Sequence, residues 1–328
     1  MKGPPLLSVR DLNVHFHIGG NFLLRRPPAI LKAVDGVSFD LAPGETLGLV
    51  GESGCGKSTL GRAVLRLLPN VEGRVVWLGE DLARLDKEAM RRKRREMQIV
   101  FQDPLAALDP RMTVGEIIAE PLRTFRPELG KAEAKAKVQA MMAEVGLLPQ
   151  QINRYPHEFS GGQCQRIGIA RAMINEPRLV VCDEPVSALD VSIQAQIVNL
   201  LMDLQRRFGM SMIFISHNLS VVRHVAHRIM VLYLGRVAEI ADRQQLYGNP
   251  RHPYTQALIS AVPIPDPDLE RAKRRLILRG DLPSPLDPPS GCAFRTRCPK
   301  ATDICAEIRP ELTPIESGHD VACHHWEE

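Results

Sequence analysis

The sequence lacks the long apolar runs that mark a membrane protein. No uninterrupted apolar stretch in its 328 residues approaches the ~20 residues that a bilayer-spanning helix needs. The first residues, MKGPPLLSVRDLNV, contain two prolines and early charges in place of the apolar core of a signal peptide. We therefore expect a protein that is made and kept in the cytosol and reaches a membrane only through a partner.

A strong imbalance of charge is also missing. The net charge of +4 is small, whereas nucleic-acid binding favours a strongly basic face, so we expect no nucleic-acid partner. The run Arg91–Arg95 could contact lipid headgroups or nucleic acid, but a solvated helix face is the favoured interpretation. A hydrophobic content of 44% is ordinary for a soluble protein with one large domain and an appendage.

Strand and helix signals alternate along the chain. A short apolar strand, Thr46–Val50, is followed at once by a glycine-rich segment and then by a helical pattern over Ser58–Leu68. Buried strands are predicted again at Leu179–Cys182 and Met212–Ser216, with a helix between them. This alternation is typical of an α/β fold, in which a parallel sheet has helices on both faces. Further strands are predicted at Ala33–Leu41, Arg228–Tyr233 and Arg236–Ile240.

The chain divides by composition into a core and a smaller module. The pattern over residues 86–175 is mostly helical, and we interpret it as a helical subdomain inserted into a core domain of residues 1–245. After Asn249, frequent prolines break up regular structure. Residues 246–328 are therefore predicted to form a separate, loop-rich C-terminal module.

The segment GESGCGKST fits the phosphate-loop pattern G-x-x-x-x-G-K-[ST] at every fixed position, and it lies between a predicted strand and a predicted helix. Its glycines let backbone N–H groups converge on the β-phosphate of a nucleotide, and the helix adds its positive N-terminal end. Lys57 supplies a charge for the β- and γ-phosphate oxygens, and Ser58 a hydroxyl for Mg²⁺. We predict that the chain binds and hydrolyses ATP, with nucleotide contacts from Gly51, Glu52, Ser53, Gly54, Cys55, Gly56, Lys57, Ser58 and Thr59.

Two carboxylates follow the apolar strand Leu179–Cys182. Asp183 can reach the coordination shell of Mg²⁺, and Glu184 can polarise a water for in-line attack on the γ-phosphate. A solvated acidic pair at a strand end is the alternative. The phosphate loop upstream favours the catalytic interpretation.

The segment Phe159–Gln163, FSGGQ, closely resembles the LSGGQ signature of ABC-type ATPases. A Ser-Gly-Gly turn before a helix makes a second anion-binding turn. The resemblance spans roughly residues 6–245 and implies a P-loop, RecA-like ABC ATPase core. In this family two such domains pair head to tail, so that each signature closes on the other subunit's ATP. Nucleotide contacts are therefore implied for Ser160, Gly161, Gly162 and Gln163.

Other residues of this sequence match functional positions of the same family. Gln102 matches the catalytic-site residue that contacts Mg²⁺ or water and senses the γ-phosphate, and His217 matches the switch histidine that contacts the γ-phosphate. Asp190 matches the loop that crosses the dimer interface near the nucleotide. Phe16 aligns with the aromatic residue that stacks on adenine, with Phe22 as a rival.

Three segments indicate a particular group within the family. They resemble the corresponding segments in the ATPase subunits of oligopeptide/dipeptide importers, especially in the second of the two ATPases. They are VFQDPLAALDPR (Val100–Arg111), Tyr247–Pro265 and Gly291–Pro310. The resemblance implies a motor for import of di- and oligopeptides, peripheral at the cytoplasmic face of the inner membrane. The implied partners are a second ABC ATPase, with a paralogue favoured, two transmembrane permease subunits and an extracytoplasmic solute-binding protein.

Four of the seven cysteines crowd the C-terminal module, with the spacing C-x5-C-x6-C-x17-C. A zinc site usually contains a close cysteine pair, which this spacing lacks, and four thiolates suit an iron–sulfur cluster as well as zinc. The resemblance implies a [4Fe–4S] cluster, because this region is associated with one in members of the importer group. Zinc, or a packing role for reduced thiols, is the alternative for Cys292, Cys298, Cys305 and Cys323.

Other functions compete with peptide import. The same importer group also serves nickel, glutathione and antimicrobial-peptide systems. Non-transport ABC proteins of translation usually carry two ATPase cores, and those of DNA repair carry a long coiled-coil insert, whereas this sequence has one core and no such insert. A redox-sensing regulator, with the metal module primary, is a further alternative.

Overall fold

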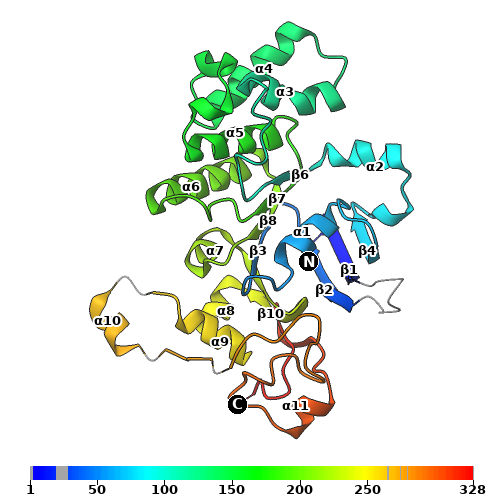
Figure 1. The fold of residues 1–328 in the computed structure, drawn as a ribbon, viewed down its shortest axis with the longest axis vertical. Helices are drawn as coiled ribbons and strands as arrows, with labels where there is room; N and C mark the ends of the chain where they lie inside the picture. The colour runs from blue at the N-terminus through cyan, green and yellow to red at the C-terminus, as the bar shows by residue number, and fades with distance from the viewer. Residues whose placement is uncertain (1–2, 20–28, 264–265, 274, 279, 328) are drawn as a thin grey trace. The chain divides into compact units, whose positions relative to one another are not determined.

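The structure is a computed structural model that describes residues 3–19, 29–263, 266–273, 275–278 and 280–327 (Figure 1). It contains two compact units. The first comprises Met1–Leu6, Leu41–Thr46 and Asp81–Ile215, and the second comprises Leu7–Asp40, Leu47–Glu80 and Ser216–Glu328. Among the helices in the described ranges, none is long and apolar enough to cross a membrane.

The first unit contains a parallel sheet of buried strands. Its strand order is β8-β7-β6, with β6 at Met97–Val100, β7 at Leu179–Asp183 and β8 at Ser211–Ile215. Cys182 lies opposite Val100 on one side and Phe214 on the other. Every residue of β7 and β8 is buried, as expected for parallel strands that are covered on both faces. The two later buried strands predicted from the sequence are thus confirmed.

In the sequence, the helices of the first unit lie before and between these strands. Helix α3 packs against both α4 and α5 (Figure 1). It begins at a capping box, in which the Thr113 hydroxyl accepts from the Glu116 N–H and the Glu116 carboxylate accepts from the Thr113 N–H. The helices are α2 (Lys87–Arg94), α3 (Val114–Phe125), α4 (Lys131–Glu144), α5 (Gly161–Met173) and α6 (Val191–Phe208), with 3₁₀ turns at Leu82–Arg84, Pro149–Asn153 and Pro156–Glu158.

The second unit contains strands in two groups. One has the order β2-β1-β4-β5, formed by β1 (Leu7–Ile18), β2 (Ala29–Leu41), β4 (Val71–Trp77) and β5 (Glu80–Asp81). The other has the order β11-β12-β10-β9-β3, formed by β3 (Thr46–Val50), β9 (Arg228–Tyr233), β10 (Arg236–Asp242), β11 (Thr313–Glu316) and β12 (His319–Val321). Strands β3 and β9 are parallel, with Val50 opposite Val231, whereas β9, β10, β12 and β11 pair antiparallel.

The helices of the second unit are short. They are α1 (Lys57–Val64), α7 (Leu219–Val225), α8 (Arg243–Gly248), α9 (Pro253–Ser260), α10 (Pro267–Ala272) and α11 (Asp303–Glu307). The sequence predicted that the first of them continues to Leu68, which is wrong. Helix α1 ends at Val64 because Arg66 adopts a φ of 52°, a left-handed conformation that terminates helices.

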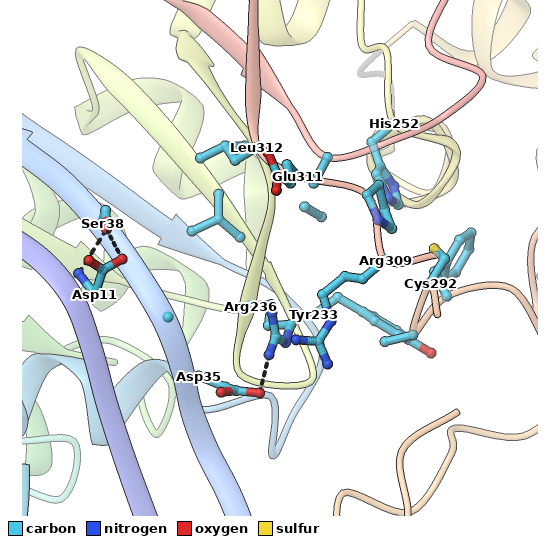
Figure 2. A pocket seen from close by; sticks show the side chains of 17 residues that line it. Asp11, Asp35, Ser38, Tyr233, Arg236, His252, Cys292, Arg309, Glu311 and Leu312 are labelled. Atoms are coloured by element: carbon cyan, nitrogen blue, oxygen red, sulfur yellow. Dashed lines mark hydrogen bonds and ion pairs between the residues drawn. The ribbon is translucent and has the colours of Figure 1, made fainter. Parts of the chain in front are cut away.

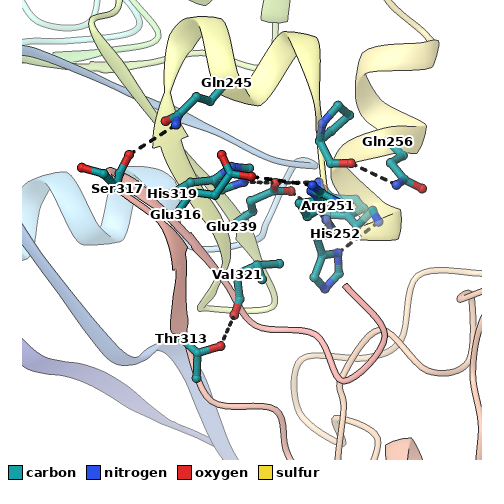
Figure 3. A network of polar contacts seen from close by, with 12 residues as sticks. Glu239, Gln245, Arg251, His252, Gln256, Thr313, Glu316, Ser317, His319 and Val321 are labelled. Carbon is teal, nitrogen blue, oxygen red and sulfur yellow. Dashed lines mark hydrogen bonds and ion pairs between the residues drawn. The ribbon is translucent and has the colours of Figure 1, made fainter. Parts of the chain in front are cut away.

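A buried polar network joins β10, β12 and the start of α9 (Figure 3). The carboxylate of Glu239, which is 0% exposed, accepts hydrogen bonds from the N–H groups of Arg251 at 2.8 Å and His252 at 2.9 Å. It also forms a 2.7 Å hydrogen bond with Nε2 of His319. Burial lowers the pKa of His252 to about 4, so this imidazole is neutral, and its Nδ1 accepts from the N–H of Tyr254. One carboxylate thus holds three separate segments of the chain together.

Candidate nucleotide-binding site

The glycine-rich loop between β3 and α1 has a backbone that only glycine can adopt. Gly51 has a φ of 150° and Gly56 a φ of 103°. A Cβ on Gly56 would lie 2.0 Å from the carbonyl oxygen of Ala33, and one on Gly51 would lie 2.3 Å from that of Leu232. The loop is therefore pressed against the backbones of β2 and β9, an approach so close that only glycine fits at these two positions.

The side chain of Lys57 forms hydrogen bonds with this loop. It is the first residue of α1 and is 4% exposed. Its Nζ donates to the carbonyl oxygens of Gly51 and Glu52, each at 2.9 Å. Cys55 is buried beside it, and burial raises the pKa of the Cys55 thiol, which stays neutral. The ammonium group is thus held on the loop by two carbonyls that a more strongly bound anion could replace.

The acidic end of β7 carries the second group of predicted residues. Asp183 is the last residue of this strand and is buried. Glu184 follows it with a φ of 47°, a left-handed conformation that is uncommon for a residue with a Cβ and that occurs often at functional sites. Its N–H donates to the carbonyl of Ile215 at the end of β8.

Gln102 reaches the same carboxylate from another segment of the first unit. Its Nε2 donates to Oε2 of Glu184 at 3.2 Å. These two residues are 82 positions apart in the sequence. The structure therefore brings together the predicted catalytic carboxylate and the predicted glutamine.

The signature segment leads into α5, with Phe159 buried and with Ser160 and Gly161 exposed. Ser160 is the N-cap, its hydroxyl accepts from the Gln163 N–H, and the Gln163 side chain accepts from the Ser160 N–H. A Cβ on Gly162 would lie 2.6 Å from a methyl group of Ile193, so glycine allows α6 to pack closely here. The first N–H groups of α5 thus lie at the surface, where a helix N-terminus favours an anion.

The remaining predicted residues lie at ends of strands and helices. Asp190 is the N-cap of α6, and the next residue, Val191, is 82% exposed. His217 is exposed and lies between β8 and α7. Phe16 is half-buried in β1, and its rival Phe22 lies outside the described residues.

The four C-terminal cysteines lie within electrostatic reach of one another. Burial raises the pKa of Cys292 and of Cys298, and raises that of Cys323 to about 11, with smaller contributions from the neighbouring thiols. The Cys292 N–H donates to the carbonyl of Cys305 at 2.8 Å. Within the described ranges, no group of three or more Cys, His, Asp or Glu side chains is close enough to hold a single metal ion. The described residues therefore do not themselves show a metal site at these cysteines.

A pocket of about 480 Å³ in the second unit borders one of these cysteines (Figure 2). Asp35 and Arg236 form an ion pair in it, and Arg309, Tyr233 and Cys292 also line it. No motif in the sequence predicted this pocket. A small molecule that enters it reaches the neighbourhood of the Cys292 thiol.

Two residues that the sequence did not single out contact the phosphate loop. The guanidinium of Arg297 binds both carboxylate oxygens of Glu52, at 2.7 and 3.0 Å. The Tyr254 hydroxyl accepts from the Glu52 N–H at 2.8 Å. Both partners lie more than 200 positions from Glu52, so no local pattern could have indicated them.

Comparison with known proteins gives matches in both parts of the chain. Residues 34–187 match the ABC transporter family, and residues 238–305 match the oligopeptide/dipeptide transporter C-terminal region. Oligopeptide transport ATP-binding protein OppF of Salmonella typhimurium is 60% identical over 97% of this chain and 95% of its own length. OppF of Escherichia coli is 59% identical with the same coverage.

Solved structures agree with this relationship. The dimeric, post-hydrolysis structure of the ATP-binding cassette MJ0796 with ADP and Pi has a TM-score of 0.64 at 27% identity, covering 72% of this chain and 98% of that one. Another, cbiO1 from Clostridium perfringens, has a TM-score of 0.62 at 24% identity and shares the fold. The expected α/β fold of an ABC ATPase is thereby confirmed. The chain belongs to the ABC-type ATPases of membrane transporters, in the group that carries the oligopeptide/dipeptide transporter C-terminal region.

Proposed function

We propose that this chain is the ATP-hydrolysing motor subunit of an importer for di- and oligopeptides. The observation that carries the proposal is the 60% identity to an oligopeptide transport ATP-binding protein over 97% of the chain. This match includes a C-terminal region typical of oligopeptide and dipeptide transporters. The domains we assign are an ATPase domain at 1–245, with a helical subdomain at about 86–175, and the C-terminal module at 246–328.

The phosphate loop would bind the triphosphate. Its backbone N–H groups would hold the β-phosphate, and Lys57 would exchange its two loop carbonyls for phosphate oxygens. Ser58, Gln102 and Asp183 are the residues that would hold Mg²⁺, which when bound neutralises phosphate charge. Carboxylate, amide and hydroxyl oxygens are ligands of the type that this ion prefers.

Glu184 would accept the proton of the attacking water. The hydrogen bond from Gln102 would orient this carboxylate, and the left-handed backbone at Glu184 supports a functional role. We assign to His217 a contact with the γ-phosphate and to Phe16 stacking on adenine. These roles come from the family pattern.

The signature at the start of α5 would act on the ATP of a second subunit. Its exposed N-terminal N–H groups favour an anion, and the exposed loop at Asp190 is suited to a protein contact. The similar cassette MJ0796 forms a dimer. We propose a paralogous ABC ATPase as partner, with two transmembrane permease subunits and an extracytoplasmic solute-binding protein. The chain would then lie peripherally on the cytoplasmic face of the inner membrane.

We also propose that the four C-terminal cysteines bind a [4Fe–4S] cluster. Support comes from their mutual electrostatic influence and from four thiolates being a usual cluster ligand set. Protein purified without oxygen should contain iron and acid-labile sulfide and absorb near 400 nm, and Cys305→Ser should lose all three. Cys164→Ser, outside the four, is the matched control. A colourless protein with stoichiometric zinc would contradict this assignment.

The motor role is tested by separating nucleotide binding from hydrolysis. Glu184→Gln should bind ATP but lose hydrolysis in the assembled complex, whereas Lys57→Ala should lose binding as well. Co-purification with membrane subunits distinguishes an importer from a non-transport ATPase. Normal turnover by Glu184→Gln would refute the catalytic assignment. Stimulation of ATPase activity by nickel or glutathione, but not by peptides, would favour the alternative substrates.

A further inference from the structure

The phosphate loop carries a carboxylate of its own. Glu52 is the second residue of the loop, and its side chain is 28% exposed. A negative charge in a loop that receives a polyanion opposes binding unless a cation compensates it. The residue that compensates Glu52 therefore bears directly on the affinity of the loop for phosphate groups.

Arg297 supplies that compensation. Both of its terminal nitrogens bind the Glu52 carboxylate, at 2.7 and 3.0 Å, in the paired geometry that makes arginine–carboxylate contacts strong. The Arg297 side chain is only 10% exposed, so solvent screens the pair weakly. Arg297 directly precedes Cys298 of the C-terminal cysteine group.

A second contact from the same region fixes the backbone of the loop. The Tyr254 hydroxyl accepts from the Glu52 N–H at 2.8 Å, and Tyr254 is fully buried. Its ring packs against Tyr233 and Phe294, with centroids 4.8 and 5.4 Å away. Phe294 in turn accepts from the Arg297 N–H through its carbonyl. The two groups that hold Glu52 therefore belong to one packed scaffold.

This scaffold is linked to the phosphate-binding lysine through a single residue. The Glu52 side chain binds Arg297, its N–H binds Tyr254, and its carbonyl accepts from Lys57. A shift of the cysteine-bearing segment would thus displace the loop backbone and the ammonium group together.

We propose that Arg297 is a positioning residue for ATP binding. Its guanidinium neutralises Glu52 and holds the phosphate loop in its binding shape. Through this residue the C-terminal module sets the affinity for the nucleotide. The inference rests on the proposed ATP site. Loss of the guanidinium leaves the Glu52 carboxylate uncompensated beside the phosphates. When Glu52 is replaced as well, no carboxylate remains for the guanidinium to neutralise.

The test is a double-mutant cycle on the full-length protein, with Mg-ATP affinity measured by titration calorimetry. Arg297→Gln should weaken binding about tenfold, within the usual range of couplings between sites. In the Glu52→Gln background the same change should cost less than about twofold, because no carboxylate is left to neutralise. Arg295→Gln, whose guanidinium binds Ser290 on the same segment, is the matched control and should leave ATP affinity as it is.

Three outcomes separate the claims. If the wild type binds ATP through Lys57 and Arg297→Gln binds it equally well, the inference is overturned. If Arg297→Gln weakens ATP binding, and the same change costs as much in the Glu52→Gln background, Arg297 has only a structural role. The inference is then again overturned. If the wild type shows no ATP binding that depends on Lys57, the proposed function itself fails. Thermal unfolding of each variant shows whether it is folded, and Arg297→Lys should retain part of the wild-type affinity.

Discussion

Glu239 offers a quantitative test of the buried polar network that joins β10, β12 and the start of α9 (Figure 3). Replacing it with alanine removes the acceptor of the Arg251 and His252 N–H groups and the partner of the His319 ring. A buried polar group left without a partner costs about 1–3 kcal/mol, and breaking a buried pair costs about 3–5 kcal/mol. Because Glu239 is 0% exposed, water does not replace the lost contacts, and we expect Glu239→Ala to lower the free energy of unfolding by ~4 kcal/mol.

The assay is urea unfolding followed by tryptophan fluorescence, since the guanidinium of Arg251 lies 6.0 Å from the centre of the Trp326 ring. Glu239→Gln is the matched variant, because its amide oxygen still accepts from the His252 N–H and its NH₂ can donate to the ring of His319, so that only the Arg251 N–H loses its acceptor. We expect this variant to lose only ~1–2 kcal/mol. A loss below about 1 kcal/mol for Glu239→Ala, or equal losses for the two variants, would refute the role given to this carboxylate.

Three further predictions concern the loop, the glutamine and pH. Gly56→Ala should lose ATP binding at least ~100-fold by calorimetry, because its Cβ would overlap the Ala33 oxygen, and Gly54→Ala should lose less, because its Cβ would meet no described atom within 4 Å. Gln102→Ala should lower kcat about tenfold or more in a steady-state ATPase assay, with ATP affinity retained, since it removes the bond that orients Glu184. The pKa of His252 is lowered by burial from 6.5 to about 4, so the unfolded state binds the extra proton between these values. Stability should therefore fall by up to ~3 kcal/mol as pH drops from 6.5 to about 4 in urea titrations, and His252→Gln should flatten that dependence.

The phosphate loop and the acidic strand end were predictable because each depends on a few neighbouring residues. Gly51 and Gly56 belong to a motif that is recognisable within nine consecutive residues, although the backbone atoms that a Cβ would overlap lie in β9 and β2. The apolar run before Asp183 has the continuous hydrophobicity of a buried parallel strand. Sequence spacing alone therefore located these elements.

Elements that depend on distant partners were not predictable. Strands β11 and β12 have four and three residues, and β12 exists because it pairs with β10 about 80 positions earlier. Strand β6 is a four-residue strand within a mostly helical stretch. The contact between Arg297 and Glu52 joins residues 245 positions apart and has no periodic signature. In each case the tertiary contact, and not local propensity, decides the outcome.

Uptake by the assembled transporter tests the central claim most directly. The complex purified through this chain would be placed in vesicles with its cytoplasmic face inward, together with the solute-binding protein outside. With ATP enclosed, labelled di- or oligopeptides should accumulate inside, and accumulation should stop with Glu184→Gln in this chain. Peptide accumulation that continues with Glu184→Gln, or that needs no enclosed ATP, would contradict the assignment of this chain as the motor.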